Sequence, residues 1–516
     1  MKEPLVMIFD VGTQSIRAIL VDKEGNVIAK TKKDEVLYMS NDNTNAEKNT
    51  YEYWNCLAEV SQELKKEYPD LFDRIEAVSV TCIRNSLVFL DKDNKPTRDA
   101  IIWLDKREVE CKKPYPLLYR IAFKLVGMAE VARVMRKNSY TNWVKEMQPE
   151  VWEKTAKLCV PSAYFNYRLT GRLADSNAAQ ACKIPYDYKK KKWLGNLAPN
   201  VQIFGCNKDR MCELVEPGDI VGYITENASK ETGLKVGTKV IATGADKACE
   251  TLGVGSNTER IASISYGTAA SVELTLDKYV EPENFMPAYS AVLKDKYNPD
   301  IQLFRGYWMV SWFKEQFCEK EVIEAKNRGI KVEQVLDEMM LKVPIGCNGL
   351  ILQPFWGPGL TTPDARGAII GFNDSHTKMH LYRAIIEGIG FGLLDGLTEM
   401  EKRAKVKVEK IGLSGGGSTS DIVCQLTADM FGREVYRVQT HETSSLGSAL
   451  ICYTTLGIYK DVDEAIENMV HIKDTFKPNM ENNAKYQEIY KKVYKKMFKR
   501  LRPMYKAMYT TPYLKS

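Results

Sequence analysis

The chain has 516 residues, of which 44% are hydrophobic and 27% are charged, the ordinary mixture of a soluble globular protein. A net charge of +6 over this length is too dilute to indicate a nucleic-acid partner, and no apolar run approaches the ~20 residues that span a bilayer. The twelve cysteines include no C-x-x-C pair, which fits reduced thiols in the cytoplasm better than a disulfide framework. The four histidines lie far from any nucleophile motif, which disfavours zinc hydrolases and Ser/His/Asp enzymes.

The first predicted element is a β-hairpin over residues 5–22, where two apolar runs flank a turn rich in Gly, Thr and Ser. Asp10 ends the first run, and a buried carboxylate there needs a cation or hydrogen-bond donors. Gly12, Thr13 and Ser15 offer N–H groups and hydroxyls that suit phosphate oxygens, and Arg17 adds a positive charge. The segment predicts a site for a metal-bound polyphosphate; the alternative is a plain hairpin turn with structural polar residues.

The next predicted elements are a third strand after a turn at Gly25-Asn26, a helix over 49–68, and strands over 75–80 and 87–90. This alternation predicts an α/β domain. The polar pair Arg84-Asn85 lies between the last two strands and can therefore point into a cleft. A guanidinium offers several fixed N–H donors, which suit the hydroxyls or carbonyl of a small molecule. A surface arginine in a hairpin loop is the alternative.

A second hairpin is predicted over residues 261–274, with a Gly-Thr turn that echoes the first. The echo divides the chain near residue 256 and predicts two lobes with a cleft between them, a favoured place for ligands. Its turn, Gly267-Thr268, lacks an acidic residue, but it could hold the same phosphate chain from the opposite lobe.

Two further motifs follow apolar strands. Asp246 precedes a helix that starts with small residues, where a carboxylate could take a proton from a substrate hydroxyl or act as a helix N-cap; the sequence leaves both open. The run Gly415-Gly416-Gly417 allows a backbone or a flat ring to approach closely. It is neither a dinucleotide fingerprint nor a P-loop, so a nucleotide would bind by another scheme; a tight strand-to-helix turn is the alternative.

The C-terminal segment has apolar residues at helical spacing over 486–501, with lysines on the other face. This pattern predicts a helix that docks on its own domain, with a basic membrane-surface helix as the alternative. The residues after Arg502 are expected to form a loose tail.

In this order, the motifs resemble those of the FGGY carbohydrate kinases, which include glycerol kinase and xylulokinase. The similarity extends over nearly the whole chain and continues through VTCIRNSLVFLD (80–91), IIWLDKR (101–107), YRLTGRLADSN (167–177), ARGAIIGF (365–372), YRAIIE (382–387) and SSLGSAL (444–450). The resemblance implies an α/β protein with two ribonuclease H-like lobes of the actin-like ATPase fold. Their interdomain cleft would close on ATP and a small sugar, ketose or polyol.

The resemblance also implies a division of labour along the chain. Residues 1–256 would form an N-terminal FGGY domain with the acceptor site and the catalytic base, 257–480 a C-terminal nucleotide-binding domain, and 481–516 a C-terminal helix and tail. Asp246 matches the general base, Asp10 the residue that helps to place Mg²⁺, and Arg84 and Asn85, together with Asp246, the acceptor site. The positions that match ATP-binding residues are Thr13, Gln14, Ser15, Arg17, Gly267, Thr268, Gly416, Gly417 and Asp421.

Departures from the family pattern leave the acceptor open. Ile83 stands where a Gln is frequent, Asp421 where an Asn is frequent, and Ala245 separates the usual Gly-Asp of the base segment. The pair Arg84-Asn85 is nearer to glycerol kinases, whereas residues 312–318 resemble the autoinducer-2 kinases. An autoinducer-2-type kinase and a glycerol kinase therefore stay as alternatives for the specific activity.

Two other classes compete with a kinase. A non-catalytic sugar-binding regulator would be favoured by loss of Asp10 or Asp246, and both are present. An actin-like polymer or chaperone ATPase would lack a small-molecule acceptor loop. The expected partner is a small sugar or polyol, with no nucleic acid and no membrane, in the cytoplasm; a homodimer is left open.

Overall fold

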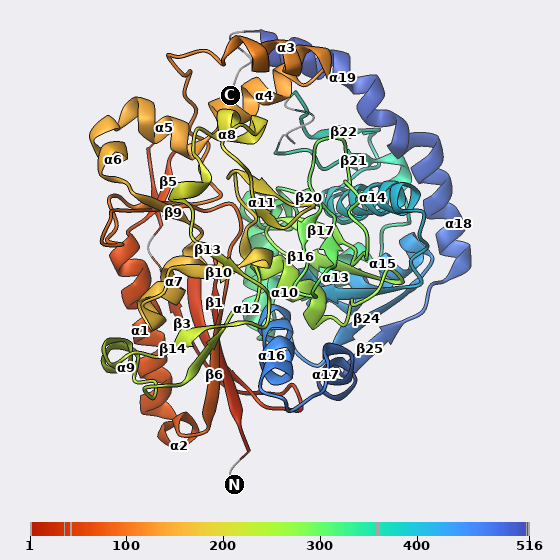
Figure 1. The fold of residues 1–516 in the computed structure, drawn as a ribbon. Coiled ribbons are helices and arrows are strands. Elements are labelled where there is room, and N and C mark those ends of the chain that lie inside the picture. The colour runs from red at the N-terminus through yellow and green to blue at the C-terminus, as the bar shows by residue number, and fades with distance from the viewer. Residues whose placement is uncertain are drawn as a thin grey trace.

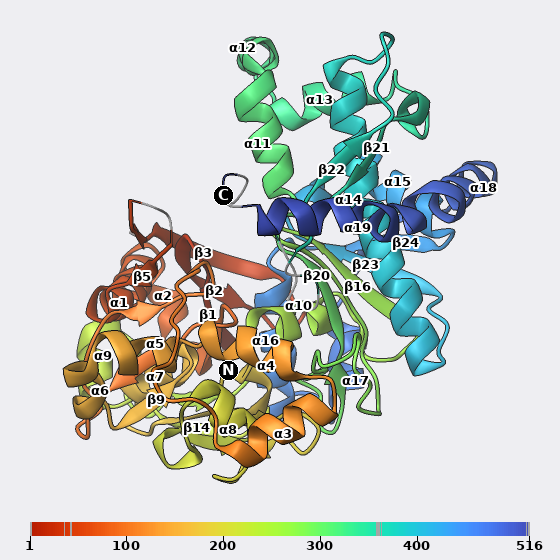
Figure 2. The ribbon, with the colours of Figure 1, turned by 90° about the horizontal axis from the view of Figure 1, so that it is seen from above.

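Two lobes, each built on a six-stranded mixed sheet, make up the computed structural model of the chain (Figures 1 and 2). The structure describes residues 3–35, 37–41, 44–357, 362, 364–511 and 513. Seen from above, the N-terminal half of the chain in red and orange lies beside the green and blue C-terminal half, and the two lobes predicted from the sequence are therefore present.

The N-terminal sheet has the strand order β14-β15-β6-β1-β2-β3. β1, β2 and β3 form an antiparallel meander, β6 runs parallel to β1, β15 runs parallel to β6, and β14 closes the edge antiparallel to β15. Every residue of β1 is buried, as its apolar sequence predicts. The bounds are β1 Leu5–Val11, β2 Ser15–Val21, β3 Val27–Asp34, β6 Ile75–Cys82, β14 Ile220–Tyr223 and β15 Lys239–Ile241.

The C-terminal sheet repeats this arrangement with the order β20-β17-β16-β23-β24-β25. β16, β17 and β20 form the meander, β23 and β24 are parallel to β16, and β25 is the antiparallel edge strand. Both predicted hairpins are confirmed, and their echo in the sequence corresponds to a repeated sheet topology. The bounds are β16 Ile261–Tyr266, β17 Ala270–Glu273, β20 Asp300–Leu303, β23 Lys410–Ser414, β24 Glu434–Val438 and β25 Ile472–Phe476.

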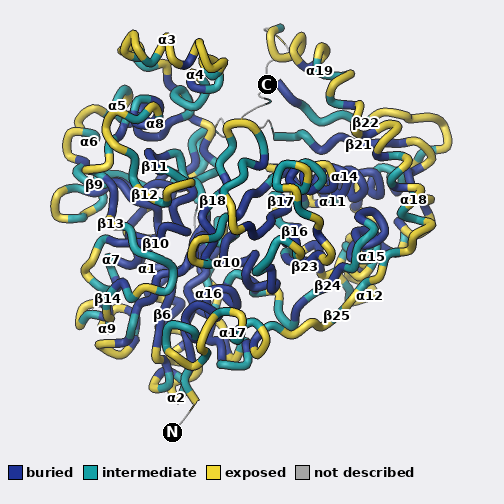
Figure 3. The backbone as a smooth tube through the Cα atoms, turned by 45° about the vertical axis from the view of Figure 1, so that its right-hand side comes forward, coloured by how far each residue is buried: buried dark blue, intermediate teal, exposed yellow. Residues whose placement is uncertain are grey.

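Two helices, α10 (Asp246–Gly253) and α16 (Thr443–Thr455), pack against each other between the sheets, and Figure 3 shows them within the buried interior. A Cβ on Gly253 would lie 1.9 Å from the Thr443 carbonyl oxygen, and one on Gly447 would lie 1.9 Å from the Cys249 carbonyl oxygen. Only glycine allows the two backbones to approach this closely. α16 also packs on β1 and β6, so a helix from the C-terminal half covers one face of the N-terminal sheet.

The remaining helices cover the outer faces of the two sheets and form the insertions at the periphery of each lobe (Figure 1). The predicted helix over 49–68 is α1, which begins after the N-cap Asn49; its side-chain oxygen accepts from two backbone N–H groups of the first turn. The other long helix, α14, has Gly388, Gly390 and Gly392 against neighbouring side chains. The bounds are α1 Thr50–Glu67, α2 Pro69–Phe72, α3 Leu117–Leu125, α4 Ala129–Lys137, α5 Tyr140–Met147, α6 Pro149–Lys154, α7 Pro161–Thr170, α8 Pro199–Phe204, α9 Glu226–Thr232, α11 Trp308–Phe317, α12 Glu319–Arg328, α13 Val332–Met340, α14 Lys378–Ala404, α15 Asp421–Phe431, α17 Val462–Met469, α18 Met480–Ile489 and α19 Lys495–Thr510.

Short strands complete the described structure, mostly as two- or three-stranded ribbons outside the main sheets. The run predicted as a strand over 87–90 forms one of them, β7. The bounds are β4 Tyr38–Met39, β5 Ala46–Lys48, β7 Val88–Leu90, β8 Ala100–Ile101, β9 Lys157–Cys159, β10 Ala174–Ser176, β11 Tyr186–Asp187, β12 Lys192–Trp193, β13 Glu213–Val215, β18 Tyr289–Ser290, β19 Tyr297–Asn298, β21 Ile351–Gln353 and β22 Ala368–Ile370.

The C-terminal segment is more ordered than the sequence predicts. The apolar face of residues 486–501 packs into the core of the C-terminal lobe, which confirms a helix docked on its own domain. The expectation of a loose tail after Arg502 is wrong, because α19 continues to Thr510. Its last turns are anchored by buried Tyr505, whose hydroxyl donates to Gln353 Oε1 at 2.8 Å, and by an Arg502–Asp364 ion pair of 3.2 Å.

No helix among the described residues is both long and apolar enough to cross a membrane.

Candidate active site

Asp10 and Arg17 are cross-strand neighbours on β1 and β2, and Arg17 Nη1 lies 2.9 Å from Asp10 Oδ2. Arg17 also approaches Glu442 Oε2 at 3.4 Å, and Lys30 Nζ lies 2.9 Å from Glu442 Oε1. Burial, together with the charges of Glu442 and Asp246, raises the pKa of Asp10 to about 6 against the opposing effect of Arg17. The hairpin therefore holds a buried carboxylate that is ion-paired with Arg17 and also experiences the charges of two other carboxylates.

The hairpin turn carries the other predicted phosphate ligands. Thr13 Oγ1 accepts a hydrogen bond of 2.8 Å from the indole N–H of Trp103, Gln14 is exposed at the tip, and Ser15 is buried at the start of β2. The Gly12 N–H donates to the Ser15 carbonyl at 2.9 Å, which closes the turn. Gln14 is thus the exposed residue of the turn, whereas the partly exposed Thr13 is already hydrogen-bonded to Trp103.

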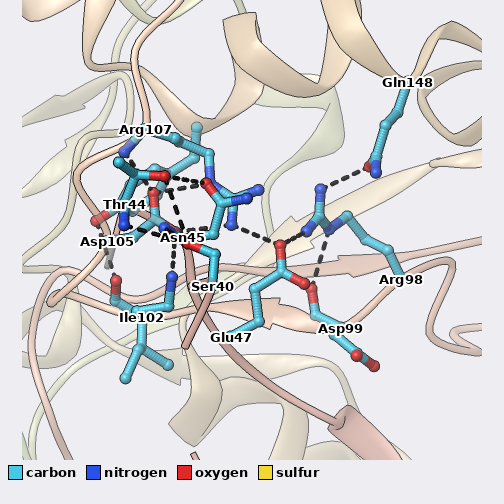
Figure 4. A network of polar contacts seen from close by, with 12 residues as sticks. Ser40, Thr44, Asn45, Glu47, Arg98, Asp99, Ile102, Asp105, Arg107 and Gln148 are labelled. Carbon is cyan, nitrogen blue, oxygen red and sulfur yellow. Dashed lines mark hydrogen bonds and ion pairs between the residues drawn. The ribbon is translucent and has the colours of Figure 1, made fainter. Parts of the chain in front are cut away.

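Trp103 belongs to a loop that is held by a buried polar network (Figure 4). Arg107 Nε donates to Asp105 Oδ1 at 2.7 Å, and Arg107 Nη2 donates to Glu47 Oε1 at 2.5 Å. Glu47 is also ion-paired with Arg98. These contacts hold the segment 101–107, and with it Trp103, in one position beside the turn.

The second hairpin presents its turn in a similar way. The Gly267 and Thr268 carbonyls accept from the backbone N–H groups of Tyr307 and Trp308, at 3.0 and 3.3 Å, which ties the turn to the start of α11. The Thr268 side chain is exposed. Ser265, two residues before the Gly-Thr turn, occupies the place that Asp10 holds in the first hairpin.

The glycine-rich run lies at the end of β23, next to this turn. Gly415 has φ +77°, and a Cβ there would lie 2.7 Å from the Tyr266 carbonyl carbon. A Cβ on Gly417 would lie 2.2 Å from the ring of Tyr307, whereas one on Gly416 would meet nothing within 4 Å. The ring of Tyr307 therefore leaves no room for a side chain at position 417. The space beside Gly416 is open.

Asp421 lies at the start of α15, with its carboxylate exposed. It forms an ion pair of 2.6 Å with Arg437, which also pairs with Asp474 and donates to the Ser418 carbonyl. This position, expected on the adenosine side, thus already has a cationic partner within the protein.

Asp246 is the first residue of α10, and the N-cap position is occupied by Ala245, which makes no side-chain cap bond. The N-cap alternative for Asp246 is therefore wrong. Its Oδ1 accepts from the Lys247 backbone N–H at 2.8 Å. Burial raises the pKa of Asp246, and the cations of Arg84 and Lys247 oppose this shift. A carboxylate with this surrounding can accept a proton from a hydroxyl.

Arg84 reaches from the loop after β6 to the C-terminal lobe, where its Nη2 lies 2.8 Å from Asp300 Oδ2. Its guanidinium lies 5.1 Å from the ring centroid of Tyr289. The predicted neighbour Asn85 has φ +53°, and its N–H donates to the Ala181 carbonyl at 2.6 Å. Arg84 thus faces the interior between the lobes, while the described contacts of Asn85 are with the N-terminal lobe.

The structure brings Asp10, Arg17, Asp246 and Arg84 to one end of the N-terminal sheet. Asp10 is the register partner of Arg17 on β2 and of Thr81 on β6. Cys82, two residues before Arg84, forms a bridge with Ala245, the residue before Asp246. Sequence reasoning missed their partners Glu442, Lys247, Asp300 and Trp103. Trp103 and Glu442 lie in or beside the motifs IIWLDKR and SSLGSAL, which could have drawn attention to them. Asp300 lies in no motif.

A magnesium site is compatible with the residues at Asp10. Among the described residues no group of three or more His, Cys, Asp or Glu side chains could enclose a metal ion. Magnesium, however, typically binds through one or two carboxylates plus substrate phosphates and water. The buried Asp10 carboxylate, with Glu442 and Asp246 nearby, supplies hard oxygen ligands.

A sheet topology that occurs twice, with helices α10 and α16 between the sheets, is the arrangement of the actin-like ATPase fold. Residues 5–253 match the model of the FGGY family of carbohydrate kinases, N-terminal domain, and residues 262–456 match that of its C-terminal domain. The chain therefore belongs to the FGGY family of carbohydrate kinases and is a phosphotransferase. Sugar kinases of this family use ATP as a substrate.

The chain is similar to curated relatives and a solved structure over nearly its whole length. It is 28% identical to a xylulose kinase of Lactococcus lactis (94% of each chain) and 23% identical to a gluconokinase of Bacillus licheniformis (93% of each chain). The crystal structure of ligand-bound xylulose kinase from Lactobacillus acidophilus superposes with a TM-score of 0.82 at 22% identity, over 98% of this chain and 99% of that one. At this identity the structural likeness supports the fold alone.

Proposed function

We propose that this protein transfers the γ-phosphoryl group of ATP to a hydroxyl of a small sugar, ketose or polyol bound beside Arg84 and Asp246. The observation that carries the proposal is the convergence of Asp246, Asp10 and Arg84 where β1 and β6 end, with Arg84 ion-paired to Asp300 of the C-terminal lobe. These are a buried carboxylate able to accept a proton, a second carboxylate beside a hairpin turn, and a guanidinium for the acceptor.

The residues act by positioning and charge, as phosphoryl transfer requires. Asp246 would orient the attacking hydroxyl and accept its proton. The turn residues Thr13 and Gln14 and the facing Gly267-Thr268 turn would hold the phosphates, with Gly416 leaving room for the adenosine. Asp10 would hold Mg²⁺, which when bound neutralises charge that develops on the phosphates.

The domain roles follow from these positions. Residues 1–256 would supply the acceptor loop and the base, and 257–480 the nucleotide side, with 481–516 as the docked C-terminal helix. Ion pairs cross this division, since Asp300 reaches Arg84 and Glu442 reaches Arg17. Exclusion of water from the closed site would suppress ATP hydrolysis.

The test is release of ADP in a coupled assay across ketoses and polyols, including D-xylulose and glycerol. Acceptor-dependent ADP release supports the proposal, and the specific activity, whether that of a glycerol kinase or an autoinducer-2-type kinase, is then defined by the best acceptor. Sugar binding without ADP release would identify a non-catalytic regulator instead. Turnover independent of any acceptor would contradict a sugar kinase.

A further inference from the structure

The acceptor side of the site contains more carboxylates than cations. The charged groups around Arg84 that influence one another are the carboxylates Asp246, Glu250, Glu273 and Asp300 and the cations Arg84 and Lys247. Neither half of the chain supplies this cluster alone. The N-terminal lobe contributes Arg84, and the C-terminal sheet contributes Glu273 and Asp300.

The guanidinium of Arg84 is already matched in charge. Asp300 lies 2.8 Å from its Nη2, and both side chains are nearly buried, with 14% and 6% of their surfaces exposed. Glu273 is the register partner of Asp300 on the adjacent strand β17. Burial lowers the pKa of Arg84, but Asp300, Glu273 and Asp246 more than offset this and the pKa is raised. An incoming ligand therefore meets a cation whose charge is already balanced.

Lys247 is matched in the same way. Its Nζ is ion-paired with Glu250 and donates to Ser265 Oγ at 2.6 Å. Glu250 Oε1 accepts from Ser265 Oγ at 2.8 Å and from Ser414 Oγ at 2.5 Å. These two bonds hold the Glu250 carboxylate against the C-terminal sheet. The charge of Lys247 is thus balanced by the carboxylate of Glu250.

Two carboxylates of the cluster have no such counterpart. Within the part of the chain that the structure describes, neither Asp246 nor Glu273 forms an ion pair; Glu273 accepts a hydrogen bond from Thr251 Oγ1 at 3.0 Å. Burial raises the pKa of Glu273, and the charges of Asp300 and Glu250 raise it too, against Arg84 and Lys247, which favours the protonated form of this side chain. Even with Glu273 neutral, Asp246 leaves the cluster one charge negative, because Asp300 and Glu250 balance Arg84 and Lys247.

We infer that the acceptor is a neutral polyhydroxy compound, a ketose or a polyol, and that Asp300 and Glu250 make the site reject acceptors with an acidic group. The inference rests on the proposed function, because it specifies the substrate class of the same site. A carboxylate brought into a buried cluster without a free cation is repelled and loses its hydration. Neutral hydroxyls can instead accept from the remaining N–H groups of Arg84 and donate to Asp246.

The experiment compares acceptors that share a carbon skeleton and differ in charge: xylitol with D-xylonate, and D-glucitol with D-gluconate, beside D-xylulose. The measured quantity is kcat/KM from ADP release for each acceptor. We expect the best neutral acceptor to exceed every aldonate at least tenfold. In Asp300→Asn, which frees the charge of Arg84, this ratio should fall at least tenfold, while the exposed-site control Asp277→Asn should leave it unchanged.

If Asp300→Asn does not fold, Glu250→Gln provides the second variant. It removes the carboxylate that balances the charge of Lys247, as Asp300→Asn does for Arg84. An aldonate used as well as the best neutral acceptor would overturn the inference and leave the kinase assignment intact. An unchanged ratio in the folded variants would overturn the role of these carboxylates. Failure of every acceptor, neutral and acidic, to release ADP would instead remove the proposed function, and the inference with it.

Discussion

Arg17 and Glu442 are separated by 425 positions in the chain, yet their side chains approach to 3.4 Å. Arg17 belongs to the first hairpin, and Glu442 immediately precedes α16 of the C-terminal half. Because Arg17 also contacts Asp10, this arginine links the carboxylate proposed for magnesium to the other half of the chain. The proposed phosphate side of the site therefore combines residues from both halves of the chain.

We expect Asp10→Asn to lower kcat and to raise the magnesium concentration needed for half-maximal activity. The substitution keeps the shape of the side chain and removes the charge that would fix the metal beside the transferred phosphoryl group. The measurement is a magnesium titration at saturating acceptor. Asp34→Asn is the matched control, since Asp34 is an exposed carboxylate at the end of β3. A normal magnesium dependence in Asp10→Asn would show that Asp10 is not a metal ligand.

We expect Asp246→Asn to lower kcat by about 10²–10⁴-fold with little change in acceptor affinity, because general-base catalysis typically contributes this much. Steady-state kinetics with the best acceptor measures the effect. Glu226→Gln, at the first position of α9 and far from the site, controls for removal of an acid from a helix start. The assignment of the base fails if Asp246→Asn keeps more than about a tenth of the normal kcat.

We expect Arg84→Ala to weaken acceptor binding by about ten- to a hundredfold, the effect of ~1–3 kcal/mol of unmatched hydrogen bonds, and to leave the affinity for ATP almost unchanged. The structure adds a second consequence, since the variant leaves Asp300 buried without its cation. Loss of one partner of a buried pair costs about 3–5 kcal/mol, so the variant should also unfold at a lower temperature.

Separate titrations of acceptor and ATP distinguish these effects. In Arg84→Ala/Asp300→Asn the unpaired charge is gone, so part of the thermal stability should return while acceptor affinity stays low. A defect confined to ATP, or no binding defect, would remove Arg84 from the acceptor site.

The stability of the protein should fall as pH rises from about 4 to 7, in part because of Asp175. Burial raises the pKa of this carboxyl to about 7, against the hydrogen bonds from Ser162, Ser176 and Asn166. Between the unfolded pKa of about 3.9 and this value, the folded state keeps a proton that the unfolded state has lost. The free energy of unfolding contributed by this group is therefore largest at low pH and is lost as pH rises through 7.

Urea unfolding at pH 5 and pH 8 measures this contribution. Asp175→Asn should weaken the loss of stability between the two pH values, whereas Glu63→Gln, an exposed substitution on α1, should preserve it. An unchanged pH dependence in Asp175→Asn would contradict a buried protonated carboxyl at this position.

Local patterns predicted the hairpins well because each one combines buried apolar runs with a glycine turn, and both properties lie within 18 residues or fewer of sequence. The same local character explains why Asp10, Arg17 and the Gly-Thr turns could be proposed as site residues. Asp300 could not, because its role depends on Arg84, which is brought to it only by the packing of two lobes. The helix beyond Arg502 was missed for a similar reason, since Tyr505 is held by a distant partner, Gln353.

The packing of α16 on β1 and β6 makes the two halves of the sequence unsuitable as independent fragments. A fragment that ends at residue 256 would expose the apolar face formed by Val6, Ile8 and Ile19, which Leu446 and Leu450 of α16 help to bury. Such a fragment should aggregate when it is produced alone, and co-expression with residues 257–516 should rescue its solubility. The backbones of α10 and α16 are in contact at Gly253 and Gly447. Separating the two halves of the chain would therefore expose the contact surfaces of both helices.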